Sequence, residues 1–106
     1  MLPVELLTPG ELAESISERV KALRLARGWT QQETAERAGI TLGTYRHFER
    51  TGSIALERLL KLAVILNAQA GFAALFALPP ARSLAELAAR TELQPRRRGK
   101  RRDAQA

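Results

Sequence analysis

The sequence predicts an all-α protein in which five to six short helices form a bundle, followed by a basic tail that stays disordered. Ala, Leu, Arg and Glu, all with good helix propensity, dominate the composition. β-branched and aromatic residues are scarce and form no alternating run, so we expect no sheet. Apolar residues instead recur at the spacing of amphipathic helices.

Length and composition suit one domain with tails. A chain of 106 residues with 45% hydrophobic residues has enough apolar side chains for one modest core. The chain has no cysteine, so neither disulfides nor thiolate metal sites are available. Its apolar segments are too short to span a bilayer, and residues 1–7 lack the basic start of a signal peptide. We therefore expect a soluble, cytoplasmic protein that does not enter a membrane.

The first predicted helix spans residues 9–27. Thr8 and Glu11 have the spacing of a capping box, in which each side chain accepts the backbone N–H of the other residue. Pro9 suits the first helical position, and Gly28 stops the helix.

Two short helices follow. Thr30, with a glutamate three residues later, opens a second capping box, and Gly39 ends this helix because glycine readily adopts the left-handed conformation. Thr41 caps a third helix over residues 42–50, which ends at Gly52.

Three further helices are predicted beyond this point. Leucines at helical spacing indicate a fourth helix over residues 56–66, which ends at Asn67. The apolar segment 68–78 predicts a fifth helix, weakened by Gly71. After two prolines, a third capping box opens a short helix over residues 84–90.

These boundaries divide the chain into four segments. They are an N-terminal extension (1–8), a helical domain (9–78), a C-terminal short helix (79–94) and the basic disordered tail (95–106). There is no internal repeat.

Residues 30–50, TQQETAERAGITLGTYRHFER, have the residue types of two short helices that cross closely. Ala35 is small where the helices cross, and Gly39 permits a sharp turn. Tyr45 and Phe48 lie at core spacing and help to close a miniature core. The segment therefore predicts a helix-turn-helix motif.

This spacing resembles the helix-turn-helix of the Cro and cI repressor family, also called the XRE family. The likeness covers residues 16–67 and includes the helix LERLLKLAVILN that follows the motif. The resemblance implies a lambda-repressor-like bundle with a helix-turn-helix DNA-binding domain over residues 9–78. It also implies a transcriptional repressor with no enzymatic activity.

In this family the second helix meets a phosphate and the third enters the major groove. By this resemblance Gln31 lies at the positively polarised start of the second helix, beside a phosphate. Arg46 is the leading candidate for a base contact, because a guanidinium matches the two acceptors of guanine. The DNA-binding residues implied are Thr30, Gln31, Gln32, Thr41, Leu42, Gly43, Thr44, Arg46, His47 and Arg50.

The sequence departs from the family pattern at Leu42 and Gly43, where many relatives place polar residues. Direct base recognition is weaker there, so dimerisation and DNA shape supply much of the specificity. The departure leaves a second hypothesis open, a protein-interaction module that keeps the bundle without specific DNA recognition. Gln31, Arg46 and Arg50 argue against it, because a docking module has no need of such residues at DNA-facing positions.

Other prominent residues have structural interpretations. Arg24 and Glu49 occupy positions that in this family form an ion pair between the first and third helices, which indicates stability rather than function. Trp29 is interpreted as a core residue at the corner of the first two helices, not as a platform for base stacking. The single histidine, His47, has no partner at metal-ligand spacing and no nucleophile to serve as a base, so we expect no metal, no cofactor and no catalysis.

The net charge of +6 is concentrated at the C-terminal end. Residues 1–95 contain eleven Lys or Arg and ten Asp or Glu, whereas residues 96–106 contain six and one. This tail has three interpretations, a solubilising segment, a non-specific DNA arm or a segment that docks on an acidic partner. We favour the DNA arm, because cations near phosphates release counterions. The six cations are Arg96, Arg97, Arg98, Lys100, Arg101 and Arg102.

A single small reading head contacts too few bases to find one genomic site, so related proteins pair two heads on a two-fold operator. We expect a homodimer whose interface is formed by large apolar residues that a short edge helix cannot bury within one monomer. Those residues are Phe72, Leu75, Phe76 and Leu78. The alternative is that Phe72 and Phe76 complete the monomer core.

Within the family, residues 44–76, the proline break and the Arg-rich end resemble the regulators paired with HipA-type kinase toxins. This finer resemblance implies a HipB-like antitoxin that represses its own operon. It also implies a HipA-type kinase toxin as a partner, with the tail or residues 79–94 as the contact.

Overall fold

The computed structural model describes residues 2–80 and 83–93. In these residues it contains six α-helices, one 3₁₀ helix and no strand, which confirms the predicted all-α fold. The chain forms two compact units, Met1–Leu75 (unit 1) and Phe76–Ala106 (unit 2). Unit 1 contains η1 (Val4–Leu6), α1 (Pro9–Ala26), α2 (Gln31–Ala38), α3 (Leu42–Thr51), α4 (Leu56–Ile65) and α5 (Ala70–Ala73), and unit 2 contains α6 (Leu84–Leu93).

Capping side chains fix where the helices begin. Thr8 and Thr30 each accept the N–H of the glutamate three residues later, at 3.1 and 2.9 Å, and the glutamate carboxylates accept the N–H groups of the threonines at 2.9 and 3.0 Å. Two of the three predicted capping boxes, those of α1 and α2, are therefore confirmed. The hydroxyls of Thr41 and Ser83 cap α3 and α6 through backbone N–H groups at 3.0 and 3.1 Å. Each of these bonds satisfies an N–H group that the helix itself leaves unpaired.

Left-handed residues end the helices as predicted. Gly39, after α2, has a φ of +73°, and Asn67, after α4, has a φ of +56°. Gly52 has a φ of +83° and also touches α1, since a Cβ atom added to it would lie 2.8 Å from the carbonyl carbon of Ala13. A side chain therefore does not fit at this position, and Gly52 sets how closely the end of α3 approaches α1.

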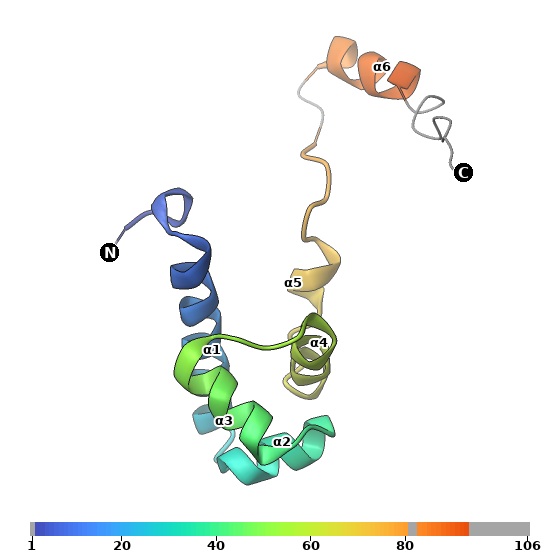
Figure 1. The fold of residues 1–106 in the computed structure, drawn as a ribbon. Coiled ribbons are helices and arrows are strands. Elements are labelled where there is room, and N and C mark those ends of the chain that lie inside the picture. The colour runs from blue at the N-terminus through green and yellow to red at the C-terminus, as the bar shows by residue number, and fades with distance from the viewer. Residues whose placement is uncertain (1, 81–82, 94–106) are drawn as a thin grey trace, which may run out of the picture. The chain divides into compact units, whose positions relative to one another are not determined.

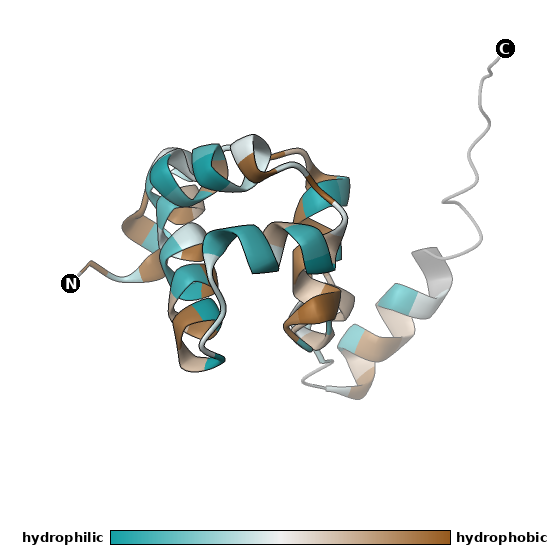
Figure 2. Ribbon diagram, turned by 90° about the horizontal axis from the view of Figure 1, so that it is seen from below, coloured by the Kyte–Doolittle hydropathy of each residue, from teal (hydrophilic) through white to brown (hydrophobic). Residues whose placement is uncertain are grey.

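The core of unit 1 lies between its first four α-helices. Tyr45 and Phe48, on the inner face of α3, are 0% and 1% exposed, which confirms their predicted place in the core. The other buried residues of this core are Val20, Ala35, Ala38, Leu62 and Leu66. Figure 1 shows α2 and α3 together at one end of unit 1, with α1 and α4 on either side. Figure 2 shows hydrophilic and hydrophobic residues alternating along these ribbons, as expected of helices with one buried face.

The fifth helix predicted over residues 68–78 is wrong in extent. The helix α5 contains only Ala70–Ala73, its N-cap residue Gln69 makes no capping bond, and Phe76 has a left-handed φ of +63°. A short segment with a glycine and no cap forms a helix only where packing supports it, and none of the residues of α5 is buried. The N-terminal extension, by contrast, contains the 3₁₀ helix η1, which was not predicted.

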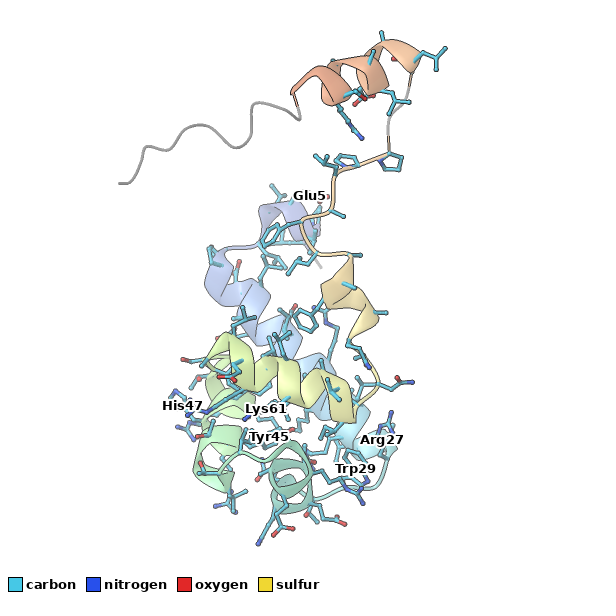
Figure 3. The ribbon with its side chains drawn as sticks, turned by 90° about the vertical axis from the view of Figure 1, so that its right-hand side faces the viewer. Glu5, Arg27, Trp29, Tyr45, His47 and Lys61 are labelled. Carbon is cyan, nitrogen blue, oxygen red and sulfur yellow. The ribbon has the colours of Figure 1, made fainter. Side chains whose placement is uncertain are left out.

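Trp29 packs at the edge of the core rather than inside it. Its side chain is half-buried, and the guanidinium groups of Arg27 and Arg37 lie 5.3 and 4.4 Å from the centre of its ring (Figure 3). The Nη2 atom of Arg27 also donates to the carbonyl oxygen of Leu66 at 2.9 Å, which joins the corner between α1 and α2 to the end of α4. These contacts support the structural role predicted for Trp29.

Candidate nucleic-acid interface

The helix α3 turns its aromatic residues inward and most of the predicted recognition residues outward. Figure 3 shows Tyr45 among the helices of unit 1 and His47 at their outer edge. Side chains on one face of a helix recur every three or four residues, so burying Tyr45 and Phe48 directs Arg46 and His47 towards solvent. The exposed residues are Thr41, Gly43, Arg46, His47 and Arg50, whereas Leu42 and Thr44 are half-buried.

The start of α2 offers backbone N–H groups to an anion. Thr30 is exposed and caps this end, and the N–H groups of Gln31 and Gln32 in the first turn have no partner within the helix. Together with the helix dipole they favour a phosphate. The side-chain amide of Gln31, however, donates to Glu49 at 2.9 Å. The backbone N–H of Gln31 is therefore the donor of this residue that can contact a phosphate without breaking a hydrogen bond within the protein.

Glu49 is the centre of a buried hydrogen-bond cluster. The Nε and Nη2 atoms of Arg24 donate to its two carboxylate oxygens at 2.9 and 3.0 Å, so the ion pair implied by the family resemblance is present and bidentate. The hydroxyl of Tyr45 and the amide of Gln31 donate to the same carboxylate. The side chains of Arg24 and Glu49 are only 8% and 6% exposed, which makes this pair part of the interior between α1 and α3.

The cluster also fixes the charge of its members. Burial alone would raise the pKa of Glu49, but the hydrogen bonds from Arg24, Tyr45 and Gln31 outweigh it and hold this pKa below its ordinary value. Burial, helped by the hydrogen bond to Glu49, raises the pKa of Tyr45. The hydrogen bond to Glu49 raises the pKa of Arg24. At neutral pH the cluster therefore consists of an ionised pair and a neutral phenol.

Two hollows beside α3 bring additional cations to the recognition residues. One, of about 320 Å³, is lined by Lys21, Gln31, Arg46, Glu49 and Arg50. The other, of about 390 Å³, is lined by Gly43, Thr44, His47, Ser53, Ile54, Ala55 and Arg58.

Lys21 on α1 and Arg58 on α4 are exposed cations on the rims of these hollows. Neither was predicted from the sequence, because both lie outside the helix-turn-helix motif. The available signal for Lys21 was its position one turn before Arg24, the residue of α1 that reaches α3. A reading helix with cations on both sides suits a major groove, whose two edges are phosphate backbones.

The residues predicted for a dimer interface divide between the two units. Phe72, which is half-buried, and Leu75, which is 54% exposed, line an apolar cavity of about 440 Å³ formed by residues of α1, α4 and the α5 region. Phe76 and Leu78, at the start of unit 2, are 94% and 74% exposed. The six cations predicted as a DNA arm, at positions 96–102, lie outside the described residues.

Two kinds of feature are absent from the described residues. None of their helices has the length and apolar character needed to cross a lipid bilayer. No group of three or more His, Cys, Asp and Glu side chains lies together as a metal ion would require.

A short capped helix, a left-handed glycine and a second helix with an aromatic inner face and a polar outer face define a helix-turn-helix DNA-binding protein. Residues 20–70 match the family model described as helix-turn-helix. They therefore form a helix-turn-helix domain of the Cro/cI type, also called the XRE type, as the sequence resemblance implied. This domain is that of a DNA-binding regulator. No curated protein matches the chain in sequence.

Proposed function

We propose that the chain is a cytoplasmic transcriptional repressor that binds a specific operator as a homodimer and has no enzymatic activity. The observation that carries this proposal is the outer face of α3, where Arg46 is exposed beside the start of α2. Two buried aromatic residues, Tyr45 and Phe48, hold this face outward. A guanidinium in this position suits the O6 and N7 atoms of guanine in the major groove.

A mobility-shift assay on the chain's own promoter tests operator binding. The wild type is expected to prefer the promoter to a scrambled duplex, and Arg46→Ala is expected to lose about 5- to 100-fold of that preference. Lys21→Ala is the matched comparison, since loss of a phosphate contact weakens binding to both duplexes alike and lowers the salt slope by about one. Equal binding of both duplexes by the wild type would contradict the proposal.

A homodimer is supported by the apolar residues that unit 1 and the start of unit 2 expose. Phe76 is 94% exposed, so Phe76→Asp should leave the fold intact. The variant is expected to sediment as a monomer at concentrations where the wild type is a dimer, because a charge would have to be buried at the interface. A dimer of unchanged stability would place the interface on other residues.

The finer resemblance to regulators of HipA-type kinase toxins supports an antitoxin that represses its own operon. In that case the tail or residues 79–94 bind the kinase. The first observation to make is whether the neighbouring gene encodes a kinase-like protein. Co-expression of the two chains should then yield a stable complex, and failure of that kinase to bind would contradict this part of the proposal.

A protein-interaction module is the second candidate, and the first turn of α3 favours it. Leu42 is half-buried and Gly43 has no side chain, which leaves few polar groups there for base contacts. Such a module would show no preference for the promoter in the mobility-shift assay, and Arg46→Ala would change nothing.

A further inference from the structure

We propose that Gln31 is a positioning residue for Arg46, and that the buried Glu49 cluster acts through Gln31 to aim the Arg46 guanidinium at DNA. The proposal rests on the operator binding proposed for α3. It also gives the ion pair between Arg24 and Glu49 a role in recognition, in addition to its role in stability.

A continuous chain of hydrogen bonds runs from the interior to the recognition face. Arg24 holds both carboxylate oxygens of Glu49, and the Nε2 atom of Gln31 donates to Glu49 Oε1 at 2.9 Å. The Nε atom of Arg46 then donates to Oε1 of Gln31 at 3.3 Å. Exposure increases along this chain, from the buried Glu49 carboxylate through the half-buried Gln31 to the exposed Arg46. Gln31 thus links the buried carboxylate of Glu49 to the exposed guanidinium of Arg46.

The chemistry of Glu49 decides which end of the Gln31 amide faces Arg46. Glu49 is an ionised carboxylate paired with Arg24, and an ionised carboxylate only accepts hydrogen bonds. Gln31 must therefore turn its NH₂ group towards Glu49, which leaves its carbonyl oxygen on the side of Arg46. A guanidinium only donates hydrogen bonds, so this orientation of the amide attracts Arg46 and the opposite one would repel it.

The bond to Gln31 occupies the Nε edge of Arg46 and leaves the terminal edge available. In the part of the chain that the structure describes, Arg46 makes no other hydrogen bond and no ion pair. Its two terminal NH₂ groups form the fork that a bidentate contact to guanine requires. A side chain already held in this way loses less conformational freedom when it binds a base. Loss of the hydrogen bond from Arg46 to Gln31 should therefore reduce base preference about 2- to 10-fold.

The first test uses the full chain labelled with ¹⁵N and needs no DNA. The Nε–H signal of Arg46, assigned by its loss in Arg46→Lys, is expected to show the heteronuclear NOE of an ordered group. Gln31→Met keeps the length of the side chain but removes both amide contacts, and should reduce this NOE to that of Arg58, which is exposed and has no hydrogen bond in the described residues. An unchanged NOE in Gln31→Met would overturn the proposal.

Gln32→Met is the matched control for this measurement. Gln32 lies in the same turn, and its amide donates to Glu36 at 3.2 Å rather than to the chain that ends at Arg46. The Arg46 signal should therefore be the same in Gln32→Met as in the wild type, and an equal loss in both variants would overturn the proposal. If Gln31→Met fails to fold, Gln31→Asn replaces it, because an amide one methylene shorter cannot reach both Glu49 and Arg46.

The second test measures base preference by selection from a library of random-sequence duplexes. Arg46→Ala is expected to lose the preference at one base pair of each half-site, and Gln31→Met to reduce that same preference about 2- to 10-fold. The double variant should lose no more than Arg46→Ala alone. Uniform weakening by Gln31→Met would make Gln31 a phosphate contact only and would overturn the proposal.

The outcomes of the selection separate the proposal from the function on which it rests. If the wild type enriches no sequence, the proposed operator binding fails and this proposal fails with it. If the wild type enriches a sequence and Gln31→Met shows the same preferences, the proposal alone is overturned.

Discussion

Glu49 shows how a small core accommodates a buried charge. Both of its carboxylate oxygens accept from Arg24, and Arg24 uses its remaining nitrogen, Nη1, to donate to the carbonyl oxygen of Trp29 at 2.9 Å. A buried ion pair repays its desolvation only when its remaining hydrogen-bonding groups are satisfied in this way. Removing one partner leaves the other buried and unpaired, which costs more than the pair contributes.

We therefore predict that Glu49→Gln lowers the free energy of unfolding at neutral pH by about 3 kcal/mol. The pKa of Glu49 is lowered in the folded state, so its carboxylate stabilises the fold above its ordinary pKa of 4.5, and this stabilisation is lost as the pH falls further. Urea unfolding between pH 7 and pH 3 measures the effect in both proteins. The difference between wild type and Glu49→Gln should narrow below about pH 4.5, and parallel curves would contradict the prediction.

Ionisation of Tyr45 reduces the stability of the fold at alkaline pH. Its pKa is raised in the folded state, so the fold is favoured while the phenol is protonated, and this contribution decreases once the pH passes the ordinary value of 10. We predict that Tyr45→Phe is less sensitive than the wild type to unfolding between pH 9 and pH 11, because it has no phenol to ionise. Circular dichroism measures the unfolding of both proteins over this range. An equal loss of stability in both would contradict the role assigned to the Tyr45 phenol.

At the scale of the elements, the orientation of α3 depends on its contact with α1. Gly52→Ala should cost about 2–4 kcal/mol, because a Cβ atom would meet the backbone of Ala13 and the residue would be strained at a φ of +83°. Gly39→Ala is the control, since Gly39 has a similar φ but open space around it, and it should cost about 1 kcal/mol from strain alone. Urea unfolding measures both. Equal costs would show that the contact with α1 has no energetic importance.

The sequence predicted best those elements whose signals are local. Thr8, Thr30 and Thr41 cap helices where expected, and Gly39 adopts the left-handed conformation where expected, because these features depend on a few neighbouring residues. The extent of α5 was not predictable in this way. An Ala-rich segment forms a helix only where another surface buries one of its faces, and that surface is contributed by residues far away in the sequence.

The candidate site also combines features that the local sequence predicts with features that only the packing of distant residues creates. The outward position of Arg46 and the burial of Tyr45 follow from helical periodicity, which the sequence contains. The hydrogen bond between Gln31 and Arg46 joins residues 15 positions apart on two crossing helices, and only the crossing brings them together. Lys21 was missed for the same reason, because it reaches the edge of α3 through the packing of α1.

At the scale of the whole molecule, positive charge is available to DNA in two separate ways. Arg46 and Arg50 lie on α3, and Lys21 and Arg58 line the hollows beside it, so all four are held by folded helices. The six cations of residues 96–106 follow one another in the sequence and carry most of the net charge of +6. Contacts from the first group depend on a defined position on the duplex, whereas contacts from consecutive cations to phosphates carry no sequence information.

Deleting residues 96–106 should therefore separate affinity from specificity. If all six cations approach phosphates, the slope of log K against log salt should become less steep by up to about 5, because each neutralised phosphate contributes about 0.9. The preference for the promoter over a scrambled duplex should be unchanged, since the groups around α3 remain. Replacing the six cations by glutamine in the full-length chain is the control, and it should reproduce the effect because charge, not length, releases counterions. An unchanged salt slope in both proteins would reject the DNA arm and leave the tail as a solubilising segment or as a contact for an acidic partner.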